Sequence, residues 1–373
     1  MPPIYFDYNA STPVDPAVAA AMQPFLKKAF GNPSSGHWAS TPAKAALERA
    51  RGQVAALIGA APDEIVFTSG GSEANNLAIK GTFFAPNRQG AHVITSAIEH
   101  PAVLAPCRFL ERLGGSVTYL PVDRTGRIDP EDVRRAITPQ TVLISIMHAN
   151  NEVGTIQPIR EIAAIAREHG IRFHTDAAQS VGKLATKVNE LGVDLLSIAG
   201  HKLYAPKGVG ALYVRSRVEL EPLIHGAGHE LGRRAGTESA LLAVGLGAAS
   251  VLAQDLKPME RVQALCDRFW RTLQDRFGDG VALNGHITHR LPNTLNVSFV
   301  GKIGAEILGQ LRGVAASTGS ACHSGRIKLS PVLAMMGVPD RIGMGAIRFS
   351  LGRTTTSDEI DDVVARLAGV ASA

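Results

Sequence analysis

Five short segments of the chain carry side chains that could do chemistry. They comprise residues 68–73, 97–101, 174–179, 197–202 and 316–325. Together they hold a glycine-rich turn, several histidines, an aspartate, a lysine and a cysteine. The first four follow apolar runs that read as strands. We expect them at the carboxyl ends of a sheet, where α/β proteins bind their ligands.

The glycine-rich turn, Thr-Ser-Gly-Gly-Ser-Glu at residues 68–73, could bind a phosphate. Glycines let an anion approach the backbone, and the free N–H groups at the start of a following helix favour a negative charge. The sequence is neither a Walker A motif nor GxGxxG. The alternative interpretation is an ordinary strand–helix turn with a serine cap.

Lys202 and Asp176 each end a strand-like run and have a chemical and a structural interpretation. A partly buried Lys202 would have a lowered pKa and could form a Schiff base; otherwise it is a surface lysine. Asp176 could bind a metal, orient a histidine or pair with a protonated pyridine nitrogen. Its alternative role is to cap the next helix.

His100 precedes a proline, which favours an extended backbone at the histidine. The imidazole could stack on a ring or move protons, or it could be a purely structural histidine.

The three cysteines differ in their sequence surroundings. Cys107 and Cys266 lie within apolar helical patterns, which indicates packing roles. Cys322 lies in a stretch of serine and glycine with almost no apolar neighbours. We therefore expect Cys322 to be the exposed, mobile and reactive thiol, with His323 next to it in sequence.

The composition excludes several classes of protein. The 373 residues are 45% hydrophobic and 19% charged, with a formal net charge of +5 and no long run of like charges, so nucleic-acid binding is not expected. An odd number of cysteines without CxxC disfavours a disulfide framework or a cysteine-built zinc site, and we expect no metal. Without a secretory pattern at residues 1–9 or a long apolar run, we expect a cytoplasmic protein and no membrane span.

Strand-like and helical patterns alternate over roughly the first two thirds of the chain, which predicts an α/β sheet covered by helices on both faces. Strands are predicted at residues 65–68, 92–96, 117–121, 142–148, 172–176, 195–198 and 211–214. After residue 240, longer helices and a few strands predict a smaller α+β domain. We expect a large domain at residues 16–255 and a small domain of residues 1–15 and 256–373.

In this order and spacing, the five segments resemble those of the NifS/IscS-type cysteine desulfurases, which are class V aminotransferase-family enzymes that use pyridoxal phosphate. The resemblance runs from Tyr-Phe-Asp-Tyr-Asn-Ala at residues 5–10 to Arg-Phe-Ser-Leu-Gly-Arg at residues 348–353. It implies fold type I, with a large, mostly parallel seven-stranded sheet domain and a smaller α+β domain, and a homodimer. Ser-Thr-Gly-Ser-Ala-Cys at residues 317–322 resembles the branch with a long cysteine loop.

The resemblance also implies roles for the cofactor-binding residues. Lys202 would bind pyridoxal 5′-phosphate through a Schiff base and later transfer protons. Asp176 would pair with the pyridinium nitrogen, Gln179 would bind the phenolic oxygen, and His100 would stack on the ring and assist proton transfer. The phosphate would be bound by Gly71, Ser72 and His201, and by Thr237 across a dimer interface.

On the substrate side, the resemblance implies that Arg348, assisted by Asn151, binds the carboxylate of L-cysteine. Cys322 would attack the substrate sulfur, leaving a cysteine persulfide and releasing L-alanine. The sulfur would then pass to an acceptor or scaffold protein that supplies iron–sulfur cluster assembly or thiolation pathways.

Two positions depart from the family pattern. Ala199 stands where a phosphate-binding serine is common, so we expect one hydrogen bond to be missing or supplied by Ser197 or water. Leu231 replaces an arginine near the expected subunit interface. The cysteine region and residues 290–294 also resemble selenocysteine lyase, which is the main alternative. An aminotransferase, another β-eliminating lyase and an inactive binding paralogue are further alternatives.

Overall fold

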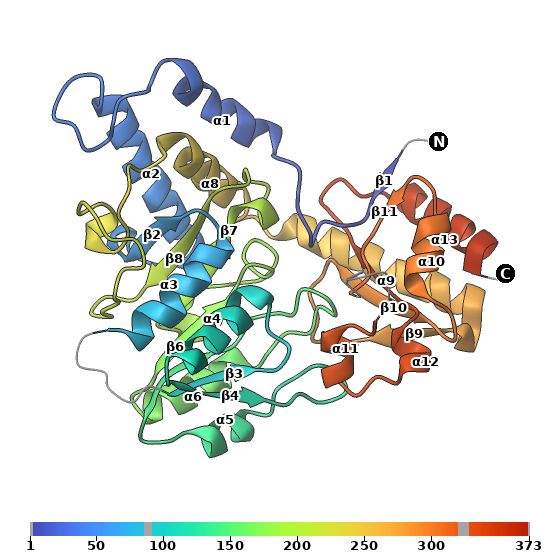
Figure 1. Cartoon of the computed structure of the whole chain (residues 1–373). Helices are drawn as coiled ribbons and strands as arrows, with labels where there is room; N and C mark the ends of the chain where they lie inside the picture. The colour runs from blue at the N-terminus through green and yellow to red at the C-terminus, as the bar shows by residue number, and fades with distance from the viewer. Residues whose placement is uncertain (1–2, 86–91, 320–327, 372–373) are drawn as a thin grey trace.

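The computed structural model describes residues 3–85, 92–319 and 328–371. Figure 1 shows a large lobe built from the first two thirds of the chain and a smaller lobe built from the last third. Cys322 and His323 lie outside the described residues. The predicted α/β class is confirmed.

The elements follow one another along the chain as follows. The strands are β1 (Ile4–Tyr5), β2 (Ile65–Thr68), β3 (His92–Ser96), β4 (Ser116–Leu120), β5 (Thr141–Ser145), β6 (Arg172–Asp176), β7 (Leu195–Ala199), β8 (Gly210–Val214), β9 (Val281–Asn284), β10 (Thr294–Phe299), β11 (Val314–Ala315) and β12 (Ala346–Ser350). The α-helices are α1 (Pro16–Lys27), α2 (Thr41–Ile58), α3 (Gly71–Phe83), α4 (Pro101–Arg112), α5 (Pro130–Ala136), α6 (Ile159–Glu168), α7 (Val188–Leu191), α8 (Ala240–Leu252), α9 (Lys257–Phe277), α10 (Gly304–Gln310), α11 (Pro331–Met335), α12 (Asp340–Gly343) and α13 (Ser357–Ala371). Short 3₁₀ helices are η1 (Pro62–Glu64), η2 (Gly200–Lys202), η3 (Glu230–Gly232) and η4 (Gly278–Gly280).

The large lobe contains a seven-stranded sheet in the order β2-β8-β7-β6-β5-β3-β4. Only β8 runs against the others, because it pairs antiparallel with both β2 and β7. Neighbouring residues of one strand face opposite sides. Thus Val93 belongs to the hydrophobic cluster that includes α3 and α4, whereas Ile94 belongs to the cluster on the opposite face, which includes α2, α6 and α8. Burial on both faces explains the apolar runs of strands such as β5 and β7.

The small lobe has an antiparallel sheet in the order β12-β10-β9 and a parallel pair of β1 and β11. Its core includes Phe6, Phe269 and Phe349, whose rings meet edge to face. Phe6 therefore brings the N-terminal segment into the C-terminal lobe (Figure 1). On this ground we propose the domain boundaries given above, with residues 1–15 and 256–373 in the small domain.

A buried ion pair anchors the loop after β8 to the large lobe. Arg51 Nη1 and Nη2 lie 2.7 and 2.9 Å from the two carboxylate oxygens of Glu230. The same carboxylate accepts a hydrogen bond from the backbone N–H of Phe67, at 2.8 Å. Loss of either charged partner would leave the other buried and unpaired, which is more costly than loss of an exposed pair.

We predict that Arg51→Met lowers the free energy of unfolding by about 3–5 kcal/mol, the usual effect of breaking a buried pair from one side. Denaturant titration followed by circular dichroism measures this change. Arg134→Met is the matched control, because Arg134 forms an exposed pair with Glu168. Equal stability of the Arg51 and Arg134 variants would contradict the prediction.

Candidate active site

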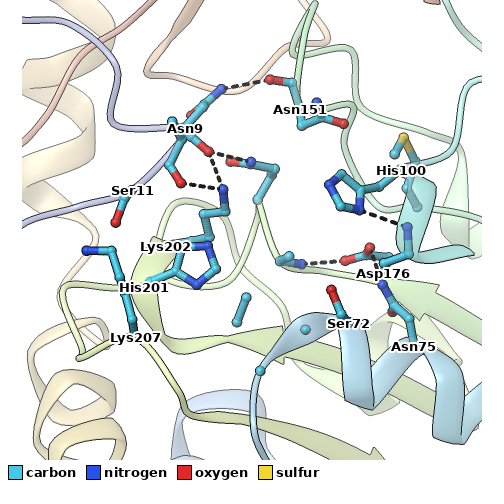
Figure 2. Close-up of a pocket in the computed structure, with 18 of the residues that line it drawn as sticks. Asn9, Ser11, Ser72, Asn75, His100, Asn151, Asp176, His201, Lys202 and Lys207 are labelled. Atoms are coloured by element: carbon cyan, nitrogen blue, oxygen red, sulfur yellow. Dashed lines mark hydrogen bonds between the residues drawn. The ribbon is translucent and has the colours of Figure 1, made fainter. Parts of the chain in front are cut away.

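A cavity of about 640 Å³ opens at the carboxyl ends of β6 and β7. Figure 2 shows side chains of the large lobe around it, together with Asn9 and Ser11 of the N-terminal segment. Arg348 on β12 comes from the small lobe. Nine residues predicted from the sequence line it: Gly71, Ser72, His100, Asn151, Asp176, Gln179, His201, Lys202 and Arg348. The structure thus brings together residues that are up to 277 positions apart in sequence (348 − 71). Their individual roles remain predictions.

Lys202 ends η2, immediately after β7, and its amine reaches the N-terminal segment. Nζ donates to the backbone oxygens of Asn9 and Ala10, at 2.5 and 2.8 Å. Burial and the charge of Arg348 lower the pKa of Lys202 against the opposing effect of Asp7 and Asp176, and the net value is about 8. Lys202 is therefore not the surface lysine of the alternative interpretation, and part of its amine is neutral near pH 7.5.

Asp176 is the last residue of β6 and its carboxylate is fixed from two sides. Oδ2 accepts from Asn75 Nδ2 at 2.7 Å, and Oδ1 accepts from the backbone N–H of Ala178 at 2.9 Å. The second contact lies within a turn at residues 178–180, so Asp176 does not cap the helix that the structural alternative predicted there. Because Asp176 also lines the cavity, it retains an acceptor edge for a ligand.

His100 caps α4 and also lines the cavity. Its backbone is extended, as the following proline predicts. Nδ1 accepts a hydrogen bond from the backbone N–H of Ala102 at 3.1 Å. Burial lowers the pKa of His100, a shift that Asp176 opposes and Lys202 reinforces. The neutral ring with Nδ1 as acceptor carries its proton on Nε2.

The glycine-rich turn lies between β2 and α3, as the sequence predicts. Gly70 has a φ of +148°, a conformation that suits glycine. A Cβ atom on Gly71 would lie 3.1 Å from Cβ of Ala199, so the turn packs closely on the end of β7. This arrangement presents the first N–H groups of α3 beside the cavity, where they favour an anion.

The proposed replacement of the missing serine by Ser197 is wrong. Ser197 is fully buried, and its Oγ lies 3.0 Å from Nε2 of His174. Since residues alternate across a strand, Ser197 and Ala199 share a face of β7, but only Ala199 reaches the cavity. His201, half-buried on η2, does line it, and burial lowers the pKa of His201 to about 4, with Lys202 and Lys207 reinforcing the shift.

Arg348, on β12, brings a guanidinium from the small lobe into the cavity. Nη2 lies 2.7 Å from Asp7 Oδ1, and Nη1 donates to the backbone oxygen of Asn151 at 2.9 Å. Its Nε is buried without a partner among the described residues. These contacts fix the plane of the guanidinium, while Asn151 and Arg348 both line the cavity. The site can therefore receive a carboxylate from a small ligand.

Sequence reasoning missed the N-terminal residues Asp7 and Asn9 and the buried Lys183. Asn9 is buried, and its backbone oxygen accepts from both Lys202 and Gln179. Lys183 donates to the side chain of Asn9 at 3.1 Å. The motif at residues 5–10 was recognised without an assigned role, because its partners lie more than a hundred residues away.

Thr237 and the cysteines complete the set of predicted residues. Thr237 is exposed and does not line the cavity of its own chain. Cys107 and Cys266 are buried in helices, as predicted, and burial raises the pKa of each to about 12. Cys322 lies outside the described residues. On the N-terminal side of Cys322, the backbone of Ser317 pairs with that of Arg348.

Within the described ranges, no three His, Cys, Asp or Glu side chains are arranged to hold a metal ion. No single helix in the same part of the chain is long and apolar enough to cross a membrane. Helices α8 and α9 meet that length and composition test only as a pair bent by 73°.

We predict that Lys202 in the folded chain, without added cofactor, reacts with formaldehyde and cyanoborohydride with a midpoint near pH 8. At pH 7.5 a pKa of about 8 leaves roughly a quarter of the amine neutral, against roughly one part in a thousand for an unperturbed lysine. Peptide mass spectrometry across a pH series measures the midpoint. The denatured chain is the control, and equal midpoints in the two states would contradict the prediction.

Comparison with known proteins gives a consistent result. The family profile described as Aminotransferase class-V matches residues 4–363. The chain is 51% identical to the cysteine desulfurase IscS of Dictyoglomus turgidum, over 98% of this chain and 94% of that protein. It is 48% identical to the IscS of Escherichia coli, with coverage of 96% and 90%.

A solved NifS-like protein superposes with a TM-score of 0.93 at 36% identity, covering 99% of both chains. A structure described as SspA in complex with cysteine gives a TM-score of 0.84 at 42% identity, with coverage of 95% and 100%. The chain therefore belongs to the class-V aminotransferase family.

Proposed function

We propose that this chain is a pyridoxal phosphate-dependent cysteine desulfurase, which converts L-cysteine to L-alanine and transfers the sulfur to Cys322. The observation that carries the proposal is the meeting of Lys202, Asp176 and Arg348 around one cavity. An amine, an acid and a carboxylate-binding guanidinium are the groups that this reaction needs. The relatives named cysteine desulfurase, at about half identity over nearly the whole chain, support the same assignment.

The residues around the cavity fit pyridoxal phosphate. Asp176 is held by Asn75, whose own Oδ1 is buried without a partner among the described residues, so this acid is fixed as an acceptor for a ring N–H. The start of α3 suits the phosphate, and Lys202 offers an amine with a lowered pKa. When bound, the cofactor acts as an electron sink for negative charge that develops on the substrate.

The protein's own side chains would bind the substrate and move its protons. Arg348 would hold the carboxylate of L-cysteine, with Asn151 beside it. Lys202 Nζ can accept a proton from the substrate α-carbon, because its pKa is near the working pH. His100 carries a proton on Nε2 and is suited to donate it within the cavity.

In the sulfur-transfer step, the thiolate of Cys322 would attack the sulfur of the substrate. A sulfur–sulfur bond forms while the substrate carbon–sulfur bond breaks, and the electron pair of that bond goes to the β-carbon. This carbon takes up a proton and becomes the methyl group of L-alanine. Cys322 keeps the transferred sulfur as a persulfide, which an acceptor or scaffold protein would then receive.

We further propose a cytoplasmic homodimer. Thr237 is exposed, and its loop is tied to the phosphate turn through Arg234, whose Nε lies 2.9 Å from Glu73 Oε1. A threonine in this place is available to a second subunit. We propose that it completes the phosphate site of the partner subunit.

We predict that Cys322→Ala lowers L-alanine formation from L-cysteine at least about 100-fold while pyridoxal phosphate stays bound, because only the nucleophile is lost. Alanine is quantified by chromatography and the cofactor by its absorbance. Cys266→Ala is the matched control and keeps the activity. Intact turnover of the natural substrate by the Cys322 variant, without L-alanine formation from L-cysteine, would favour an aminotransferase or β-eliminating lyase. Alanine formation from L-selenocysteine alone would favour selenocysteine lyase.

We predict that Arg348→Lys raises KM for L-cysteine about 10–100-fold, since a lysine replaces a planar fork by a point charge and leaves Asp7 with a weaker partner. Steady-state kinetics measures the change. Arg353→Lys is the control, because Arg353 does not line the cavity that Lys202 and Arg348 share. An unchanged KM in the Arg348 variant would contradict its role in carboxylate binding.

A further inference from the structure

Lys183 is a buried lysine that the mechanism above does not use. It lies between β6 and α7, is only 8% exposed, and does not line the main cavity. A separate space of about 10 Å³ lies beside Lys183 and Lys202, at the lower limit for a single water molecule. The amine of Lys183 therefore finds its hydrogen-bond partners mainly among protein atoms.

The hydrogen bonds of Lys183 match a neutral amine. Nζ donates to Asn9 Oδ1 and to Gln179 Oε1, each at 3.1 Å. A neutral amine has two N–H groups, so both are used. No carboxylate lies within salt-bridge distance of Lys183 in the described ranges. Burial, together with the charges of Lys202 and Arg348, lowers the pKa of Lys183 to about 7.

Two contacts together fix which end of the Gln179 amide faces which partner. Since Lys183 donates to Oε1, the amide nitrogen is turned the other way, where Nε2 donates to the backbone oxygen of Asn9 at 3.0 Å. An amide nitrogen has two N–H groups, and this bond uses one of them. Gln179 lines the cavity, so the second N–H is left for a bound ligand.

The two acceptors of Lys183 differ in how much they depend on it. Asn9 Oδ1 also accepts from Asn293 Nδ2 at 3.0 Å, so it keeps a partner when Lys183 is removed. Gln179 Oε1 has no other partner in the described part of the chain. Without Lys183, only the bond from Nε2 to the backbone oxygen of Asn9 holds the amide, and the amide plane can turn about that bond. The second N–H of Nε2 would then no longer be held toward the ligand.

We propose that Lys183 is a positioning residue that fixes the Gln179 amide with its N–H toward the cofactor cavity. This inference rests on the proposed function, in which Gln179 donates to the phenolic oxygen of the cofactor. Lys183 touches neither cofactor nor substrate, and it acts through Gln179. Its effect is therefore expected to vanish when the amide of Gln179 is absent.

A double-mutant cycle on ligand binding tests the proposal without any turnover. The probe is pyridoxamine 5′-phosphate, which keeps the phenolic oxygen, ring nitrogen and phosphate but has no aldehyde to react with Lys202. Its Kd is measured by calorimetry on the full chain freed of cofactor. The variants are Lys183→Met, Gln179→Ala and the double variant.

We predict that Lys183→Met weakens binding of the probe about tenfold, the usual effect of losing one hydrogen bond to a charged group. In the Gln179→Ala background, the same substitution changes Kd less than about twofold. Lys187→Met is the matched control and leaves Kd unchanged, because Lys187 donates only to backbone oxygens of Ala56 and Leu57 on α2.

Equal weakening in both backgrounds, or none in either, would overturn the role of Lys183. If Lys183→Met does not fold, Lys183→Leu, which also lacks a donor, takes its place in the cycle with the same expected and contradicting results. Failure of the wild-type chain to bind the probe would instead count against the proposed function. Binding by the wild-type chain with an additive cycle would count against Lys183 alone.

Discussion

The hydrogen bonds of Asn9 hold the two lobes and the cavity in one arrangement. Its backbone oxygen accepts from Lys202 and Gln179, which belong to the large lobe. Its side-chain nitrogen donates to Thr294 on β10, and its backbone N–H donates to Ser350 on β12. A buried polar group without its partners is costly. The N-terminal segment can therefore leave this place only at a large cost.

Burial at this junction gives the site its reactivity. Lys202 and Lys183 lie close to one another and to Arg348, so desolvation and positive charge together lower the pKa values of both lysines. Asp7 pairs with Arg348 and limits the accumulation of positive charge. The packing that joins the lobes thus lowers the pKa values of Lys202 and Lys183 toward neutral pH, while the guanidinium of Arg348 remains available to bind a carboxylate.

The sequence predicts some elements of this fold better than others, for a physical reason. β2, β3 and β6 are predicted to the residue. β2 and β3 are buried along their whole length, and their apolar and β-branched residues are typical of buried strands. Helix α2 was not predicted. It packs on α8 so closely that a Cβ on Gly247 would lie 2.7 Å from Ala50 Cα. Small residues allow the two helices to pack this closely, but they give the sequence little of the apolar periodicity that would predict a helix.

The residues of the candidate site also differ in how well the sequence predicts them. Residues that follow a strand, such as Asp176 and Lys202, could be predicted because the end of a sheet is a common place for ligands. Asn9 and Lys183 could not, because their importance comes from contacts made only in the folded chain. At Ala199 the chain departs from the family pattern, so the phosphate contact expected at this position cannot be carried over from the family. Since Ser197 is bonded to His174, the side-chain hydroxyl expected at the phosphate has no replacement from β7. Burial lowers the pKa of His201, so the start of α3 and the nearby amine of Lys207 supply much of the positive potential that favours an anion.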